Sequence, residues 1–221
     1  ASRLMWAADG TLFMTVGGSY VFADTGSYAQ DPGTHFGKLM RLNDDGTAVD
    51  DNPFVGNAGI APEIWAYGLR HPQHFSWDTD NRMFIGDIGQ NLFENVRIIR
   101  NGENHGWNVF EGFAEFSDRY RRKGETYIPP VLSYRRKDGV SVTAGYVYRA
   151  RKDSSYYGAF IFADFESKRI WAMTQKDRQL VKVRQIGVCP EKPCSFGIDE
   201  NGELLVIGYE GTIYRLQLEG S

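Results

Sequence analysis

The amino-acid sequence predicts an all-β protein, and within that class a β-propeller of about four blades. Short runs rich in β-branched and aromatic residues recur along the chain, each bounded by Gly, Asp, Asn or Pro. The 25 glycines suit the tight turns that join such strands, and no amphipathic pattern lasts for more than about two helical turns. We therefore expect a single β-propeller domain over 1–221, with a two-sheet β-sandwich as the alternative.

The expected strands are the runs of strand-forming composition, at 12–18, 38–44, 82–89, 142–150, 159–165, 169–174, 180–187, 204–210 and 212–218. One pattern among them supports the propeller. A turn of Asp, Asn or Gly precedes a strand that ends in Gly, as in AADGTLFMTVGG, DTDNRMFIGDIG and DENGELLVIGYEG. Small antiparallel sheets that repeat in this way are typical of propeller blades. The long loops at 19–37 and 108–128 interrupt the repeat, and we expect them to carry function.

The bulk composition excludes several classes of protein. A hydrophobic content of 42% and an aromatic content of 14% are enough for a real core, which argues against disorder. The net charge is −3 without a basic block, which argues against a nucleic-acid binder. The basic cluster at 119–123 is expected to be a solvated loop. No apolar run approaches the roughly 18 residues of a transmembrane helix, so no membrane span is expected.

The two cysteines lie close together, at Cys189 and Cys194. A zinc site would need two further soft ligands, and the neighbouring sequence offers none. We expect a local disulfide that closes a turn, in preference to two free thiols. Such a disulfide indicates an oxidising compartment.

The polar residues of greatest interest fall between Glu63 and Trp107. This stretch contains an Arg-His pair at 70–71, a Gly-Gln turn at 89–90 and an Asn-His-Gly-Trp turn at 104–107. Loops on a rigid β-scaffold commonly carry binding and catalytic residues in this way. The stretch therefore predicts a polar site at the ends of strands.

Several motifs, in the same order along nearly the whole chain, resemble one family. The chain is similar to the soluble glucose/sorbosone dehydrogenase superfamily of six-bladed propellers, which use pyrroloquinoline quinone (PQQ) and calcium. It looks most like the aldose sugar dehydrogenase branch, which is shared with the propeller of hedgehog-interacting protein. The motifs are DDNPFVG, EIWAYGLRHPQ, GDIGQNLFENV, NGENHGW, EGF, VTAGYVYR, FADFESKRIW and SFGIDENGELLVIGYEGTIYRL.

The resemblance implies a fold, an activity and a location. About two further blades would precede Ala1, and the catalytic His that acts as general base would also lie upstream of Ala1. The implied activity is oxidation of an aldose at its anomeric carbon by hydride transfer to the quinone, with a cytochrome or another acceptor taking the electrons. A periplasmic or secreted location follows. Because four blades leave strand edges exposed, another chain or fragment could complete the propeller.

The resemblance also carries residues over to the cofactor. Arg70 matches the Arg that faces the acidic groups of PQQ and orients the quinone, a role that suits a guanidinium fork. His71 stands where the sugar dehydrogenases have Asn, and Thr143 matches a polar residue that faces the cofactor. Lys192 lies near the position of the family's Arg pair, and Glu166 stands in place of a cation. The alternatives are an ion pair of Arg70 that holds a loop, and a Thr143 hydroxyl that caps its own turn.

The calcium ligands carried over are oxygen donors, which suit a hard cation. The backbone carbonyls of Gly89 and Gln90, the carboxylate of Glu94 and the carbonyl of His105 match ligand positions. Glu115 matches a loop acid that completes a second ion. In the alternative interpretation, the acids of this region are only turn and surface residues. They are Asp87, Glu94 and Glu115.

A non-catalytic propeller is the competing function. It would keep the calcium-braced fold and bind a protein or a glycan through its loops, as hedgehog-interacting protein does. Four departures favour it, because each removes a feature of the dehydrogenases: His71, Gln90, Glu166 and Cys194. Fold resemblance does not decide between the two.

Overall fold

A computed structural model describes residues 3–18 and 22–218. Ala1 and Ser2, where the chain opens, and 19–21, at the start of the expected loop 19–37, lie outside the described residues. The described chain is nearly all β, as predicted, and its only helical segments are two short 3₁₀ turns, η1 (Phe22–Asp24) and η2 (Asp118–Tyr120).

The strands form four antiparallel sheets that follow one another along the chain, together with one small hairpin. The first sheet has the order β1 (Leu4–Trp6), β2 (Leu12–Val16), β3 (Lys38–Leu42), β4 (Ile64–Tyr67). The second has the order β5 (Pro72–Trp77), β6 (Met83–Asp87), β7 (Phe93–Ile99), β10 (Leu132–Arg135). The third has the order β11 (Val142–Val147), β12 (Phe160–Asp164), β13 (Arg169–Lys176), β14 (Gln179–Val188). The fourth consists of β15 (Pro193–Ile198), β16 (Leu204–Gly208) and β17 (Ile213–Arg215), and the hairpin of β8 (Phe110–Glu111) and β9 (Ala114–Glu115).

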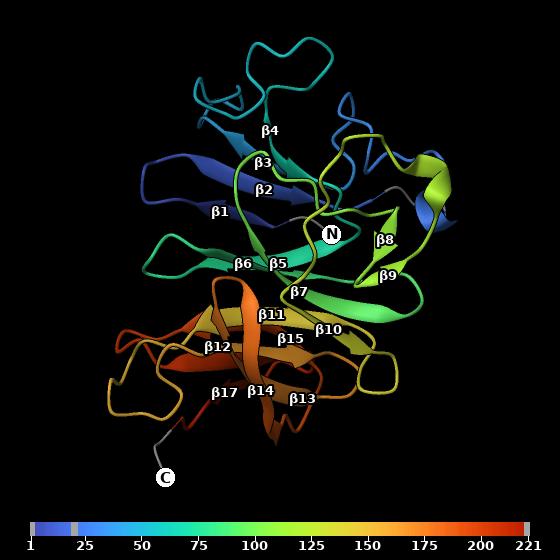
Figure 1. The fold of residues 1–221 in the computed structure, drawn as a ribbon. Coiled ribbons are helices and arrows are strands. Elements are labelled where there is room, and N and C mark those ends of the chain that lie inside the picture. The colour runs from blue at the N-terminus through green and yellow to red at the C-terminus, as the bar shows by residue number, and fades with distance from the viewer. Residues whose placement is uncertain (1–2, 19–21, 219–221) are drawn as a thin grey trace.

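In Figure 1 the first sheet lies at the top, the second in the middle, and the third and fourth sheets together form the lower part. Strand β11 packs between β5 and β15, so the first strands of the second, third and fourth sheets are neighbours. This is the arrangement of the inner strands of propeller blades. The prediction of a β-propeller with about four blades is confirmed, and each expected strand is present with its ends shifted by a few residues.

Three hydrophobic cores lie between the four sheets. The first joins the β1–β4 sheet to the second sheet, through residues such as Phe13, Leu39 and Phe75. The second core contains the stacked rings of Phe84 and Phe160, whose centroids are 4.6 Å apart. The third joins β12 and β13 to β15 and β16. Each inner sheet is thus covered on both faces, and this explains why its strands read as continuous apolar runs.

Strand β6 shows how one run serves two cores. All five of its residues are buried. Phe84 belongs to the core shared with the third sheet, whereas Ile85 belongs to the core shared with the first sheet. Successive side chains of a strand point to opposite faces, so a run without polar alternation fits a blade that has a neighbour on each side.

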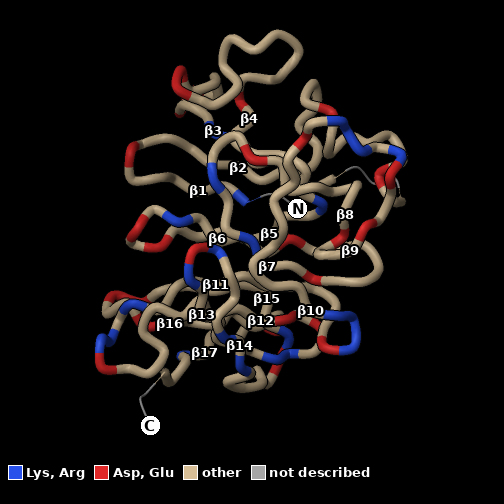
Figure 2. The backbone as a smooth tube through the Cα atoms, viewed as in Figure 1, with Lys and Arg blue, Asp and Glu red and all other residues tan. Residues whose placement is uncertain are grey.

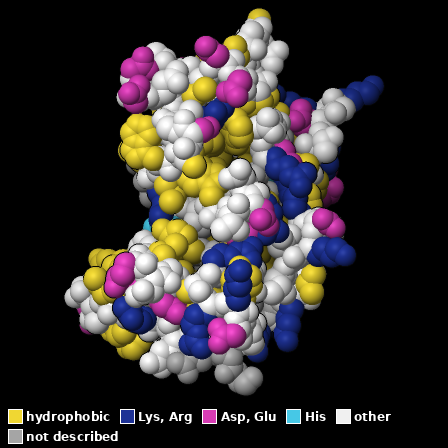
Figure 3. Space-filling view, turned by 90° about the vertical axis from the view of Figure 1, so that its left-hand side faces the viewer, with side chains coloured by type: hydrophobic (Ala, Val, Ile, Leu, Met, Phe, Trp, Pro, Cys, Tyr) yellow, Lys and Arg dark blue, Asp and Glu magenta, His cyan; other side chains and the backbone are white. Residues whose placement is uncertain are grey.

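Charged side chains of both signs are intermixed along the loops and sheet edges (Figure 2). The face turned to the viewer in Figure 3 likewise carries basic, acidic and hydrophobic side chains side by side. In the described part of the chain, no helix is both long and apolar enough to cross a membrane.

The expected disulfide between Cys189 and Cys194 is wrong, because both are free thiols. Cys189 is buried, and its backbone N–H donates to the carbonyl of Lys168. The Cys194 Sγ lies on β15 and contacts the carbonyl oxygen of Ile207 at 3.3 Å. The two cysteines are therefore held by different neighbours in the last two sheets, and they give no support for an oxidising compartment.

A buried aspartate closes the end of the second strand in two of the blades. Asp87 ends β6, and its Oδ1 accepts the backbone N–H groups of Arg70 at 3.0 Å and His71 at 2.8 Å. Asp164 ends β12 and accepts the N–H of Ser141 at 2.7 Å. In both blades the bonded N–H groups lie just before the inner strand, so the aspartate fixes the loop that enters it.

Asp87 also forms an ion pair inside the protein. Its Oδ2 accepts from Nε of Arg97 at 2.9 Å, and both side chains are almost fully buried. Nη1 of Arg97 donates in addition to the carbonyls of His105 at 3.1 Å and Ile128 at 3.4 Å. Burial lowers the pKa of Arg97, whereas Asp87 raises it. One guanidinium thereby joins β7, the end of β6 and the loop that follows β7.

Replacing Arg97 by Met should destabilise the protein by about 3–5 kcal/mol, because the Asp87 carboxylate would stay buried without its partner. The measurement is urea unfolding of the full-length protein. The matched control is Arg100→Met, at an exposed position just after β7, which should change the free energy of unfolding by less than about 0.5 kcal/mol. Equal midpoints for the two variants would contradict this account of the pair.

Acid should weaken the fold through His74. Burial, with a smaller contribution from Arg3, lowers the pKa of His74 to about 4, and its buried Nδ1 has no hydrogen-bond partner. In the unfolded chain this histidine is protonated below its ordinary pKa of about 6.5, whereas in the folded protein it stays neutral down to about pH 4. The free energy of unfolding therefore decreases as the pH falls from 6.5 to 4. His74→Gln should remove roughly 3 kcal/mol of this pH dependence.

The check is the free energy of unfolding measured at intervals from pH 7 to pH 4 on the full-length protein. His35→Gln is the control, because His35 is an exposed loop residue. Burial also lowers the pKa values of His71 and His105, and both residues contribute the same pH dependence of stability to the wild type and to the two variants. A His74→Gln profile with the same slope as the wild type would show that this histidine is not the cause.

Candidate functional site

The structure brings Arg70 and Gln90 together at the loop ends of β5 and β6. Nε and Nη2 of Arg70 donate to Oε1 of Gln90 at 3.1 and 2.9 Å, and Nη1 donates to the carbonyl of Ile88 at 3.1 Å. The backbone carbonyl of Arg70 accepts from the N–H of Gly18 at 2.6 Å. The Arg-His pair and the Gly-Gln turn of the sequence therefore form one local structure.

Arg70 is a half-buried cation without a carboxylate partner. Its guanidinium lies over the ring of Trp107, 5.7 Å from the centroid. No acidic side chain within the described ranges forms an ion pair with it, although the charges of Asp87, Glu111 and Glu94 raise its pKa from farther away. The alternative of a loop-holding ion pair is therefore not what the structure contains. Burial lowers the pKa of Arg70, but a guanidinium stays charged at neutral pH. One N–H on Nη1 and one on Nη2 have no acceptor among the residues described.

His71 is held through its backbone N–H, which donates to Asp87, and Thr143 through its hydroxyl. Burial lowers the pKa of the half-buried His71, so its imidazole is neutral near pH 7. The buried hydroxyl of Thr143 donates to the carbonyl of Pro193 at 2.9 Å. It thus joins β11 to β15, rather than capping its own turn.

Lys192 is an exposed residue whose charge is paired. Its Nζ donates to both carboxylate oxygens of Glu166, at 2.9 and 2.8 Å, and lies 5.1 Å from the ring centroid of Phe165. Glu166, which stands where the family has a cation, is therefore paired with Lys192, the cation that remains near that position. Lys192 offers a weaker anion site than Arg70, because an anion would compete with Glu166.

Two of the predicted calcium ligands are in contact with Arg136. Gly89 follows β6, and its carbonyl accepts from Nη2 of Arg136 at 3.0 Å. The fully buried Glu94 lies with Oε1 2.8 Å from Nη1 of Arg136, and its Oε2 accepts the N–H of Val142 at 3.0 Å. Burial raises the pKa of Glu94 to about 8, although Val142 and Arg136 both act in the opposite direction.

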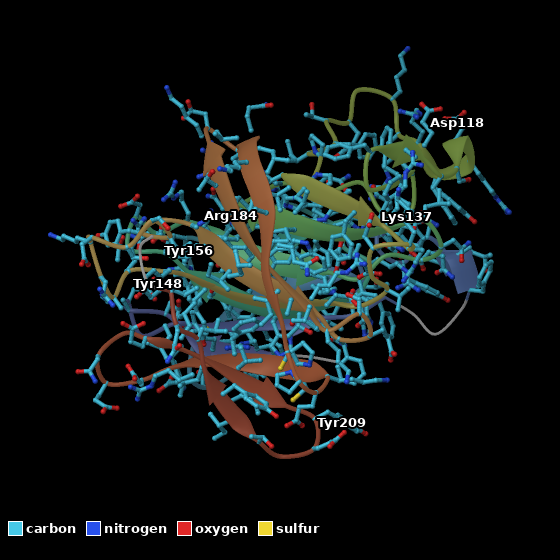
Figure 4. The ribbon with its side chains drawn as sticks, turned by 90° about the horizontal axis from the view of Figure 1, so that it is seen from below. Asp118, Lys137, Tyr148, Tyr156, Arg184 and Tyr209 are labelled. Atoms are coloured by element: carbon cyan, nitrogen blue, oxygen red, sulfur yellow. The ribbon has the colours of Figure 1, made fainter. Side chains whose placement is uncertain are left out.

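The other predicted ligands are separate from this pair. The carbonyl of His105 accepts from Arg97, and Glu115 is exposed on β9, where Oε1 is 2.7 Å from Nη2 of Arg121. Arg121 also pairs with Asp118, which is labelled in Figure 4. The described residues contain no group of three His, Cys, Asp or Glu side chains that could hold a metal ion.

The carbonyls of Gly89 and His105 and the carboxylates of Glu94 and Glu115 contact guanidinium groups, although Oε1 of Glu94 makes no hydrogen bond. Gln90 meets Arg70 through its side-chain oxygen. A donor set that is already held by cations does not fit calcium.

Glu111 supports the same turn from the other side and was not singled out in the sequence. Its Oε1 accepts the backbone N–H groups of Asn91, Leu92 and Phe93 at 2.7, 2.8 and 3.2 Å. A Cβ at Gly89 would lie 1.7 Å from the carbonyl oxygen of Phe93, so only glycine fits this turn. The EGF motif marked the location of Glu111, but nothing in its spacing shows a contact with residues about 20 positions earlier.

The arrangement is suited to binding an anion. A guanidinium that lies over an aromatic ring and has N–H groups without an acceptor can receive a carboxylate or a quinone oxygen. The nearby Arg136 has 28% of its side chain exposed, so it adds positive potential to the same turn. The general-base His and the two preceding blades remain predictions.

Comparison with known proteins gives three results. The family model described as Glucose / Sorbosone dehydrogenase matches residues 1–206. HIPL1 protein of Arabidopsis thaliana is 30% identical over 202 residues, which are 78% of this chain and 29% of that protein. Aldose sugar dehydrogenase YliI of Escherichia coli K12 is 35% identical over 106 residues, which are 48% of this chain and 28% of that protein.

A solved structure shares the fold. The PQQ-bound form of an aldose sugar dehydrogenase from Streptomyces coelicolor superposes with a TM-score of 0.73 at 22% identity, covering 93% of this chain and 55% of that one. The present chain spans less than a third of the length of the two curated relatives. Because the family model matches most of the sequence, the chain belongs to the Glucose / Sorbosone dehydrogenase family.

Proposed function

We propose that this chain forms the cofactor-facing side of a sugar dehydrogenase that binds PQQ over Arg70 and oxidises an aldose at its anomeric carbon. Family membership and the relatives named as sugar dehydrogenases support the reaction class. A cytochrome or another electron acceptor, a periplasmic or secreted location, and a further chain or fragment that completes the propeller belong to the same proposal.

The observation that carries the proposal is the unpaired guanidinium of Arg70. A cation that is removed from water without a counter-ion is costly unless a ligand supplies the charge. Four arginines with well-covered side chains each have a carboxylate within 3.0 Å: Arg41, Arg97, Arg149 and Arg178. Arg70 is thus the position where an acidic ligand would complete the local electrostatics.

The residues of the chain would bind and orient the cofactor. When bound, PQQ supplies the electron-poor quinone that accepts a hydride. Arg70 would donate two parallel hydrogen bonds to a carboxylate or quinone oxygen, and Gln90 and Trp107 would hold the guanidinium plane in place. The proton of the sugar hydroxyl would go to the His expected upstream of Ala1.

A second function is favoured by a specific observation. Thr143 and Lys192, which the resemblance assigns to the cofactor, both have partners within the protein. This favours a non-catalytic propeller, which would bind a protein or a glycan through its loops.

Arg70→Met should weaken PQQ binding by about 10- to 100-fold, since a charge-assisted hydrogen-bonded contact contributes about 1.5–3 kcal/mol. The measurement is calorimetric titration of the full-length protein with PQQ, followed by dye reduction with several aldoses. Arg70→Lys keeps the positive charge but lacks the planar guanidinium fork. Its PQQ affinity should lie between those of the wild type and Arg70→Met.

Arg135→Met is the matched control, because Arg135 is an exposed arginine at the end of β10. Its PQQ affinity should equal that of the wild type. If wild-type protein neither binds PQQ saturably nor reduces the dye, the dehydrogenase proposal fails and the non-catalytic propeller replaces it.

A further inference from the structure

The turn between β10 and β11 sends one arginine into the neighbouring Gly89–Glu94 segment. Nη2 of Arg136 donates to the carbonyl of Gly89, and Nη1 lies 2.8 Å from Oε1 of Glu94 while donating to the carbonyl of Val140 at 2.6 Å. The next residue of the turn, Lys137, is labelled in Figure 4. One guanidinium therefore contacts a carbonyl and a carboxylate that lie five residues apart, in addition to its own turn.

These two oxygen groups are the kind that a hard divalent cation would take. Glu94 is fully buried, and a buried carboxylate needs a cationic partner or hydrogen-bond donors. Arg136 supplies the cation, and the N–H of Val142 supplies a donor to the second oxygen. Calcium needs about six to eight oxygen ligands, and the described residues contain no group of three His, Cys, Asp or Glu side chains that could hold a metal ion. Oε1 of Glu94 has no hydrogen bond, so the charge of Arg136 is what balances it, and Oε2 of the nearby Glu111 is also buried without a partner.

The opposite side of the same segment is also satisfied by the protein. The N–H groups of Asn91, Leu92 and Phe93 point to Glu111, which accepts all three. The carbonyl side of the turn is thus held by a cation and the N–H side by an anion, both of them side chains.

We infer that the Arg136 guanidinium is the resident cation of the Gly89–Glu94 segment, and that this site therefore takes no calcium. A calcium ion would have to displace the guanidinium, which would then lose two strong partners in a half-buried position. The inference concerns metal dependence, and it holds for either function proposed above.

Arg97 on β7 makes a similar contact with a backbone carbonyl in the loop that follows β7. It donates to the carbonyl of His105, a third oxygen that the resemblance assigns to calcium, and it is itself neutralised by Asp87. Two different arginines thus contact three of the predicted ligand groups. Exchange of the ion for guanidinium groups explains all three contacts together.

The test is calcium linkage on the full-length protein, measured as the melting temperature with millimolar CaCl2 and with excess EGTA. Wild-type protein is expected to change by less than about 1 °C, because a ligand that does not bind cannot stabilise. Arg136→Gln frees the Gly89 carbonyl and Glu94, so calcium should raise its melting temperature by about 3 °C or more. Arg135→Gln, the adjacent exposed arginine, should behave like the wild type.

Two outcomes would overturn the inference. One is a wild-type melting temperature that falls by several degrees in EGTA and loses this response in Glu94→Gln. The other is an Arg136→Gln protein whose calcium response equals that of the wild type.

If Arg136→Gln does not fold, Arg136→Lys takes its place. The ammonium keeps the charge but cannot reach both oxygen groups with a planar fork. Its calcium response should therefore exceed that of the wild type, and an unchanged response would again overturn the inference.

Discussion

The buried ion pair of Asp87 and Arg97 organises the candidate site. One carboxylate oxygen holds the N–H groups of Arg70 and His71, and the other receives the guanidinium that also binds the His105 carbonyl. The pair costs desolvation energy, and a well-packed hydrophobic pair could give equal or greater stability. The pair instead acts by positioning. It fixes the arrangement of three loops that enter the site from different strands.

The same physical problem recurs wherever a propeller loop leaves strand pairing. Backbone carbonyls that turn inward need donors, and this chain repeatedly supplies them from cationic side chains. Nζ of the buried Lys38 donates to the carbonyls of Tyr28, Ala29 and Phe36 at 2.8, 3.0 and 2.7 Å. Arg97 and Arg136 act on the loops of the second sheet in the same way. A loop that is held by its own chain is preorganised without an added ion.

The fold could be predicted from the sequence because it is set by local patterns. The runs at 82–89 and 159–165 became β6 and β12, since a blade between two neighbours needs apolar residues on both faces. Strand β7 was not predicted, because FENVRII places Glu94 and Arg97 inside the protein. Buried polar residues interrupt the apolar signal, and only their tertiary partners explain them.

The candidate site was predicted less completely, for a related reason. Arg70 and Gln90 stand in adjacent motifs and do meet, but the partner of Gly89 is 47 residues away in the sequence. No spacing rule connects Arg136 to a glycine carbonyl across two strands. The prediction of a disulfide was wrong for a similar reason. Cys189 and Cys194 are close in the sequence, but both are free thiols with different neighbours in the last two sheets.

The internal arginines change what an acidic ligand would meet at Arg70. Arg70 and Arg136 bind successive carbonyls of one turn, those of Ile88 and Gly89. The charge of Arg136 is shared with Glu94, while Glu111 is occupied by three backbone N–H groups. Arg70 is therefore left as the cation with unused donors, and Arg136 strengthens the positive potential behind it. An anion bound there would rely on fixed guanidinium groups instead of an exchangeable ion, so its affinity would depend on salt concentration and be independent of calcium.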